Sequence, residues 1–167
     1  MAERFTIRPA RIEDAEAIHA ALLGIAHAIG KPHKITSTVD DIRRDGFGAQ
    51  PRFSTLIVEI DSEFAGMCLY FPIYSTWRGK PGAYVQDLFV AERFRGMNLG
   101  KRLLRHLARE VVGQGGVYVE LQVDLGNVPA QRFYQRIGME RDDDYVYNFM
   151  DDALLAFAGS KDDEENA

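Results

Sequence analysis

Cysteine is the scarcest residue type in this sequence, because Cys68 stands alone among 167 residues. A single cysteine cannot form an intrachain disulfide, which excludes the small disulfide-rich secreted folds. Its neighbours Met67, Leu69 and Tyr70 are apolar, so we expect Cys68 to be a small core residue and not a nucleophile. The scarcity of cysteine therefore agrees with a cytoplasmic localisation, which we expect for this chain.

Long apolar runs and an excess of positive charge are missing as well. No window approaches the roughly 20 apolar residues of a membrane span, and the N-terminal stretch MAERFTIRPA lacks the apolar core of a signal peptide. The formal net charge is -5, which disfavours nonspecific nucleic-acid binding because that binding needs clustered lysine and arginine. We therefore expect neither a membrane nor a nucleic acid as a partner.

The composition that remains is that of an ordinary globular protein, with 46% hydrophobic and 27% charged residues. A length of 167 residues suits one domain, and the sequence shows no internal repeat or low-complexity block. We expect a single domain over residues 1–158. The acidic residues 159–167 offer almost no apolar side chain to a core, which predicts a disordered tail.

Hydrophobic periodicity predicts a chain in which a run of strands gives way to alternating strands and helices. The expected strands are Arg4–Arg8, Phe53–Ile60, Phe64–Tyr74, Tyr84–Val90, Val117–Val123 and Tyr145–Met150, with a loop over Thr76–Gly82. The expected helices are Asp14–Ile29, Ser37–Asp45, Leu99–Gly113 and Val128–Ile137. This order predicts an α/β class of fold, a mixed sheet with helices on both faces and one right-handed βαβ crossover.

The stretch FRGMNLGKRLL, residues 94 to 104, precedes the first turn of a predicted helix. Backbone N–H groups at a helix N-terminus lack intrahelical partners, and the helix dipole favours an anion there. Gly96 and Gly100 permit close approach of a ligand, while Arg95 can contact a phosphate. Asn98 tolerates the left-handed conformation better than other non-glycine residues. Taken alone, the stretch is equally compatible with an ordinary strand-to-helix turn.

Residues 95 to 100, RGMNLG, resemble the R/Q-x-x-G-x-G/A pyrophosphate loop of the GNAT superfamily of N-acetyltransferases, with Asn98 replacing the first motif glycine. Downstream, the segment from Asn127 to Gly138 resembles the N-x-x-A/S-x-x-F-Y-x-x-x-G segment of the same superfamily. The stretches DGFG (45–48), YSTWRGK (74–80) and YVQDLFV (84–90) are similar to the spermidine/spermine, or diamine, acetyltransferase branch. The resemblance covers nearly the whole chain except the acidic tail.

The resemblance implies a GNAT fold, namely a mostly antiparallel central sheet with a βαβ core that binds acetyl-CoA between two splayed parallel strands. Strand backbone would pair with the pantetheine arm, and the loop amides would hold the pyrophosphate. The implied cofactor-binding residues are Leu88, Phe89, Val90, Arg95, Gly96, Met97, Asn98, Leu99, Gly100, Lys101, Asn127, Ala130 and Tyr134. Acetyl-CoA is thus the expected cosubstrate, and we expect no metal.

Tyr134 is the general acid that the resemblance implies, donating a proton to the departing CoA thiolate. A phenol with a pKa near 10 is protonated at neutral pH and can serve this role. Periodicity alone would favour a buried aromatic packed beside Phe133, but the matching segment from Asn127 to Gly138 favours the acid.

The general base is open at this level. Gln86 occupies the substrate-side position where the diamine branch typically has a glutamate, and a neutral amide cannot accept the proton of the incoming ammonium. Glu120 is our substitute candidate for the base. An equal alternative is that Glu120 is only a solvated residue on the strand surface. Strand alternation predicts that Asp87 points to the side opposite Gln86. A chain of water molecules leading to solvent would also suffice.

The acceptor is expected to be a primary amine of a small molecule, attacked directly. The loop AHAIGKPHK, residues 26 to 34, is basic, whereas polyamine enzymes of this branch present acidic and tyrosine residues there. We therefore expect a substrate other than a polyamine, an amino-acid amine being one possibility. An acyl-CoA-binding module without transferase activity is the alternative function. The branch commonly forms homodimers, so the resemblance also implies a homodimer.

Overall fold

A five-stranded sheet runs through the first part of the chain in the order β1-β2-β3-β4-β5. Neighbouring strands are antiparallel except β4 and β5, which are parallel and are joined through α3. The strands are β1 Phe5–Pro9, β2 Ser54–Ile60, β3 Glu63–Ser75, β4 Lys80–Val90 and β5 Tyr118–Leu121. The predicted mixed, mostly antiparallel sheet with a βαβ unit is confirmed.

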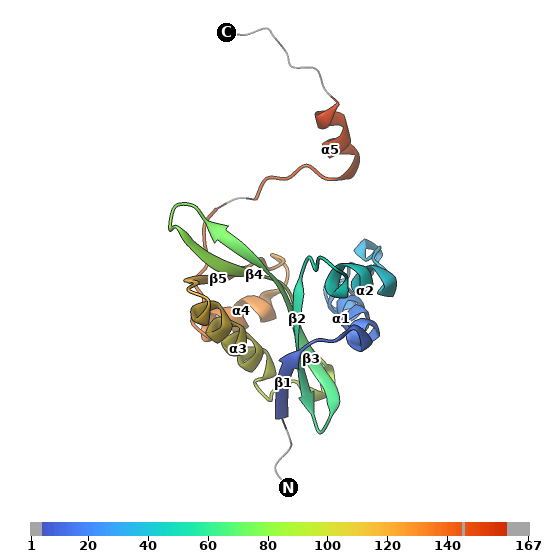
Figure 1. The fold of residues 1–167 in the computed structure, drawn as a ribbon, viewed down its shortest axis with the longest axis vertical. Helices are drawn as coiled ribbons and strands as arrows, with labels where there is room; N and C mark the ends of the chain where they lie inside the picture. The colour runs from blue at the N-terminus through green and yellow to red at the C-terminus, as the bar shows by residue number, and fades with distance from the viewer. Residues whose placement is uncertain (1–4, 145, 160–167) are drawn as a thin grey trace. The chain divides into compact units, whose positions relative to one another are not determined.

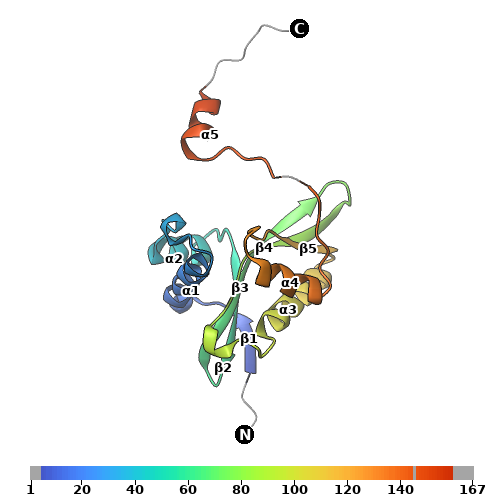
Figure 2. The ribbon, with the colours of Figure 1, turned by 180° about the vertical axis from the view of Figure 1, so that it is seen from behind.

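Helices lie on both faces of this sheet, as predicted. The helices α1 and α2 lie on one face and α3 on the other (Figure 1, and Figure 2 from behind). Their bounds are α1 Ala15–Ala28, α2 Val39–Phe47, α3 Leu99–Gly113, α4 Val128–Arg136 and α5 Asp151–Ala158, with short 3-10 turns η1 Ile12–Asp14, η2 Pro32–Lys34 and η3 Glu92–Phe94. In the described part of the chain, none of these helices has the length and apolar character needed to cross a bilayer.

The computed structural model describes residues 5–144 and 146–159. These residues divide into two compact units, with the boundary between Phe133 and Tyr134. The single domain over residues 1–158 stays a prediction. Most of the expected acidic tail, residues 160–167, lies outside the described residues.

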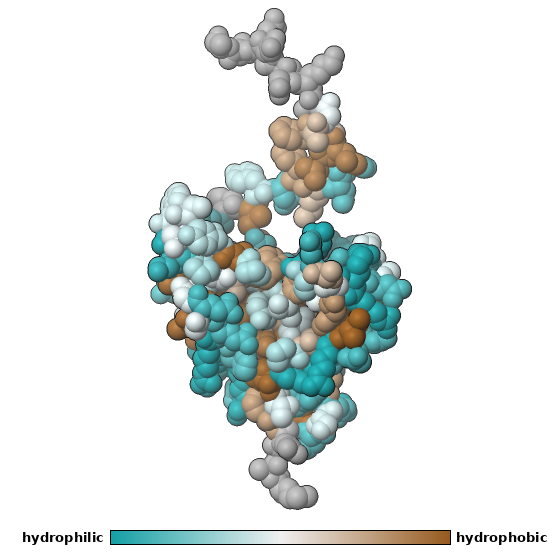
Figure 3. Space-filling view, in the orientation of Figure 1, coloured by the Kyte–Doolittle hydropathy of each residue, from teal (hydrophilic) through white to brown (hydrophobic). Residues whose placement is uncertain are grey.

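Two apolar layers cover the sheet because its side chains alternate between faces. On one face, Ile57, Met67 and Leu69 pack with Ile18 and Leu22 of α1. On the other face, α3 buries its apolar stripe, whose buried members are Leu99, Gly100, Leu103, Leu104, Leu107 and Val111. The face of the first unit that Figure 3 shows is mostly hydrophilic, with small apolar patches.

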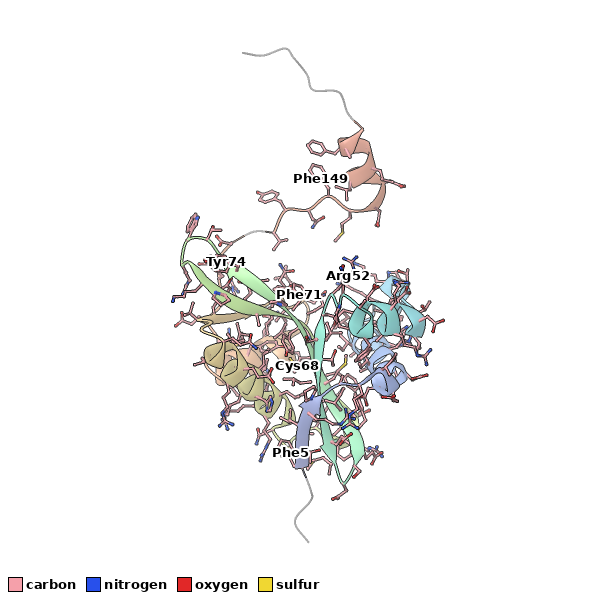
Figure 4. All side chains as sticks on the ribbon, in the orientation of Figure 1. Phe5, Arg52, Cys68, Phe71, Tyr74 and Phe149 are labelled. Carbon is pink, nitrogen blue, oxygen red and sulfur yellow. The ribbon has the colours of Figure 1, made fainter. Side chains whose placement is uncertain are left out.

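Cys68 lies in the middle of the sheet (Figure 4) and is fully buried. Burial raises the pKa of its thiol to about 12, and the nearby charges of Asp87 and Glu110 act in the same direction. A thiol that is protonated at neutral pH and shielded from solvent is a poor nucleophile. The prediction of a core cysteine is therefore confirmed.

The structure corrects several predicted elements. The strand expected at 145–150 is not found in its described part, 146–150, which has no regular secondary structure. Lys80 to Gly82, expected in a loop, belong to β4, where they pair with β3. The fifth strand is shorter than predicted, and the helix α5 was not predicted at all.

Candidate active site

The parallel strands β4 and β5 pair over only four residues. Gly82 to Val85 of β4 lie opposite Tyr118 to Leu121 of β5, and β5 then ends while β4 continues to Val90. Along the β4 edge that pairs with β5, the residues from Gln86 to Val90 therefore have no partner in β5 within the described chain. Such an edge can hydrogen-bond an extended, amide-containing ligand as if it were another strand.

A β-bulge begins this unpaired stretch. In the pairing of β3 with β4, Leu69 lies opposite Asp87 and Tyr70 lies opposite Val85, so Gln86 is an extra residue without an opposite number. Gln86 is exposed, as a substrate-side position requires. The bulge redirects the side chains that follow it, which a simple alternation of residues does not predict.

The contacts of β3 establish which face each neighbour of the bulge occupies. The Tyr70 hydroxyl donates a hydrogen bond to Oε2 of Glu110 on α3, at 3.0 Å, so Tyr70 and its opposite residue Val85 face α3. Leu69 packs in the core against α1, so its opposite residue Asp87 faces α1. Opposed residues of antiparallel strands share a face.

Asp87 is a half-buried carboxyl group, and this burial raises its pKa to about 6. The pKa of Tyr84 is raised too, by burial first and then by the negative charges of Glu120 and Asp87. Tyr84 thus interacts electrostatically with both carboxylates. Sequence reasoning did not select Asp87 as a functional group, because only the bulge and the burial reveal its environment.

Glu120 shares this face with Tyr84. A Cβ atom at Gly82 would lie 2.6 Å from Cε1 of Tyr118, so Tyr118 covers the α1 side of Gly82. Alternation along β5 then places Glu120 on the same side as Tyr118. Glu120 is exposed, however, whereas Asp87 is half-buried.

The loop after β4 has the conformation that an anion-binding loop requires. Asn98 immediately precedes α3 and is left-handed, with φ 59 and ψ 22, and Gly96 has φ 84. Asn98 makes no side-chain cap, so its side chain does not satisfy the first backbone N–H groups of α3. A Cβ at Gly96 would meet no atom within 4 Å, which leaves this side of the loop open. The exposed side chains of Arg95 and Lys101 flank it.

Packing brings Leu88 of β4 and Phe133 of α4 to the first turn of α3. A Cβ at Gly100 would lie 3.2 Å from Cζ of Phe133 and 3.7 Å from Cδ2 of Leu88. The Oδ1 atom of Asn127 accepts a hydrogen bond from the backbone N–H of Ala130 at 3.2 Å, which caps α4. Leu88, Gly100 and Phe133 are therefore close in space, while Asn127 orients α4. Met97 is half-buried and Leu99 is buried.

Tyr134 follows Phe133 in the same helix, α4. It is the first residue of the second compact unit, and its carbonyl oxygen accepts hydrogen bonds from the N–H groups of Ile137 at 3.2 Å and Met139 at 3.0 Å. The role of Tyr134 as general acid stays a prediction.

An ion pair joins the two loops that follow α1 and β5. Lys31, at the end of the turn after α1, donates a hydrogen bond to Oδ2 of Asp124. This hydrogen bond is the main reason why the pKa of Asp124 is lowered, and the charge of Lys34 also contributes. The loop predicted to be basic therefore reaches the chain segment that continues β5.

We also searched the described residues for a metal site and for pockets outside this region. Within residues 5–144 and 146–159, no group of three or more histidine, cysteine, aspartate or glutamate side chains is arranged to hold a metal ion. A small pocket lies elsewhere, beside α2 and the start of β2, and none of the predicted site residues lines it.

The site thus combines a parallel strand pair that ends at Val85 and Leu121 with an open, left-handed loop at a helix N-terminus. The chain belongs to the acetyltransferase (GNAT) family, whose family model matches residues 22–139, well over half of the chain. The protein is accordingly an acetyl-CoA-dependent N-acetyltransferase, as the sequence predicted.

Individual relatives agree with this assignment. The chain is 30% identical over 142 residues to a thialysine N-epsilon-acetyltransferase of Mus musculus, covering 80% of this chain and 83% of the relative. It is 32% identical over 108 residues to an L-ornithine N5-acetyltransferase of Arabidopsis thaliana, covering 65% of this chain and 44% of that relative. Among solved structures, an aminoglycoside N-acetyltransferase, AAC(6')-Iy in complex with CoA, has the same fold, with a TM-score of 0.71 at 15% identity over 89% of this chain and 95% of that one.

Proposed function

We propose that the protein acetylates the side-chain amine of a small amino acid and does not act mainly on polyamines. The observation that carries the transfer step is the unpaired edge of β4 leading directly into the open loop before α3. Backbone groups of Leu88, Phe89 and Val90 would hydrogen-bond the pantetheine arm of acetyl-CoA. The N–H groups from Gly96 to Lys101 would hold its pyrophosphate, with Arg95 adding a charged contact.

The acceptor class follows from charge and from the names of two relatives. Thialysine and L-ornithine, named for the two relatives, each carry a side-chain amine and a carboxylate. The loop after α1 holds Lys31, His33 and Lys34, and of its two lysines only Lys31 forms an ion pair among the described residues. A positively charged loop repels a polycation but attracts a carboxylate.

In the proposed reaction, the neutral amine nitrogen attacks the thioester carbonyl, a C–N bond forms and the C–S bond breaks. Tyr134 would donate its phenolic proton to the departing thiolate as the charge develops on sulfur. Glu120 is one candidate for the group that removes the proton from the amine.

The test is release of free CoA thiol from acetyl-CoA in the presence of matched pairs of amines. L-Ornithine and thialysine are compared with spermidine and with putrescine, which is L-ornithine without its carboxylate. We expect kcat/KM for L-ornithine to exceed that for putrescine by about tenfold or more, the value of one charge-assisted contact of about 1.5 kcal/mol. Fast turnover of spermidine would overturn the acceptor assignment. Binding of acetyl-CoA with no thiol release on any amine would instead favour an acyl-CoA-binding module.

Reversing the charge of Lys34 tests the same assignment from the protein side. We expect Lys34→Glu to raise the KM for L-ornithine by about fivefold to tenfold, because an attraction of about 0.6 kcal/mol becomes a repulsion of similar size. The KM for putrescine should not rise, since putrescine has no carboxylate. Steady-state kinetics on both amines check this prediction, and equal effects on the two would contradict it. Lys80→Glu, at the start of β4, is the matched control.

The cytoplasmic localisation and the homodimer belong to this proposal as well. A buried, reduced Cys68 as the only cysteine supports the first. The resemblance to the diamine branch supports the second, and light scattering of the purified protein would measure its mass in solution.

A further inference from the structure

We propose that Asp87, which the β-bulge at Gln86 turns toward the α1 face of the sheet, is the group that accepts the proton of the attacking amine. The assignment rests on the proposed acetyl transfer and adds the base that this reaction needs. The diamine branch typically has a glutamate at the position of Gln86. We assign the role of base to the next residue in the chain, Asp87.

The position of Asp87 follows from the register of the sheet. It precedes Leu88, the first residue of the edge assigned to pantetheine, and successive residues of a strand are about 3.3 Å apart. Its side chain shares the α1 face with Phe89, since Met67 and Leu69, which lie opposite Phe89 and Asp87, both belong to the core against α1. Gln86 is neutral at every pH, so it cannot take this proton itself.

The chemistry of the surroundings favours an ammonium group beside Asp87. Among residues 5–144 and 146–159, no lysine, arginine or histidine nitrogen lies within 4.0 Å of its carboxylate in an ion pair. Burying a carboxylate costs free energy unless a positive charge lies beside it. A bound ligand can supply that charge. An amine acceptor arrives as an ammonium ion and would supply it. Tyr84 and Glu120 add acidic and hydrogen-bonding groups on the same face.

Two titratable groups, Cys68 on β3 and Tyr84 on β4, interact electrostatically with Asp87. The other titratable groups on neighbouring elements are Tyr118 and Glu120 on β5 and His19 on α1, whereas Tyr70 on β3 and Glu110 on α3 lie on the opposite face of the sheet. His19 bonds through Nε2 to the carbonyl oxygen of Ser37 at 2.7 Å, and Glu110 accepts from Tyr70. Burial raises the pKa of Asp87 to about 6, which keeps it ionised at neutral pH while making it a stronger base than an ordinary aspartate.

The proton balance of the step is simple. The bound ammonium gives one proton to a carboxylate oxygen of Asp87, and the nitrogen lone pair is then free to attack the thioester carbon. The second proton lost by nitrogen when the amide forms returns through solvent to the general acid, and the proton on Asp87 leaves to solvent, so that one proton is released in each turnover. The thiolate receives its own proton from the general acid.

The test is the pH dependence of kcat/KM for wild type and Asp87→Asn with L-ornithine. For wild type we expect kcat/KM to fall as the pH drops through about 6, because protonated Asp87 cannot accept a proton. Asp87→Asn should lose about tenfold or more of kcat/KM at pH 7.5 and should no longer show this inflection, while its affinity for acetyl-CoA stays within about twofold. The Glu120→Gln variant should keep the inflection.

A double variant provides a rescue experiment. Adding Gln86→Glu to Asp87→Asn places a carboxylate at the position that the diamine branch uses, and we expect it to restore part of the lost kcat/KM. Unchanged kcat/KM in Asp87→Asn, or loss of the inflection in Glu120→Gln alone, would overturn the assignment. The wild-type profile is an independent check: an inflection near pH 4 in place of pH 6 would also overturn it. If wild type acetylates no amine at all, it is the proposed function that fails.

Discussion

Replacing Tyr134 with phenylalanine is expected to lower kcat by about a hundredfold, the lower range of what a general acid contributes. The change removes one hydroxyl group and leaves the ring, so the fold of α4 should be retained. Without the phenolic proton, CoA must leave as the free thiolate, and the barrier to breaking the C–S bond rises. Release of CoA thiol under saturating acetyl-CoA and L-ornithine measures the effect.

The affinity for acetyl-CoA separates this role from a structural one. We expect the dissociation constant of Tyr134→Phe to stay within about twofold of wild type, because the phenol acts on a charge that develops only during the reaction. Tyr74→Phe is the matched control, since Tyr74 is an exposed residue of β3 (Figure 4) and should keep full activity. A kcat within threefold of wild type in Tyr134→Phe would assign the proton transfer to another group.

The second large effect is expected at Asn98. Asn98→Val places a β-branched residue where the backbone is left-handed, with φ 59, and this conformation costs a residue of that type about 1–3 kcal/mol. The free loop would relax to another conformation, and binding of acetyl-CoA would have to restore it. We therefore expect the affinity to weaken by about thirtyfold, as measured by titration calorimetry.

Asn98→Gly is the matched control for that experiment. Glycine adopts the left-handed conformation freely and also restores the first glycine of the family motif, so acetyl-CoA should bind at least as tightly as to wild type. Equal affinities for the valine and glycine variants would show that the shape of this loop does not determine binding. Thermal unfolding of both variants distinguishes a local effect on the loop from loss of the fold.

The fold class could be predicted because its strongest signals are local. The apolar stripe of α3 and the alternation of β5 depend on residues close together in the sequence, and the structure shows both elements. The left-handed Asn98 was also foreseeable, since asparagine adopts that conformation more readily than other non-glycine residues. The segment 146–150 shows the limit, because its alternation predicts a strand while the segment is irregular, and strand formation depends on pairing with residues distant in the sequence.

The candidate site could be predicted in part for the same reason. The loop from Arg95 to Lys101 is contiguous, and the sequence identified it. The bulge at Gln86 is set by the register between β3 and β4, which depends on residues far apart in the chain. The environment of Asp87 depends on that register and on burial beneath other elements, so composition and spacing could not show its raised pKa.

The central claim is that acetyl-CoA binds along the unpaired edge of β4 with its pyrophosphate on the loop before α3. A crystal structure of the protein with acetyl-CoA tests it most directly. The account predicts pyrophosphate oxygens within about 3.2 Å of the N–H nitrogens between Gly96 and Lys101, and pantetheine amides paired with the backbone of Leu88 to Val90. Acetyl-CoA bound elsewhere, for example in the pocket beside Phe47 and Thr55, would contradict it.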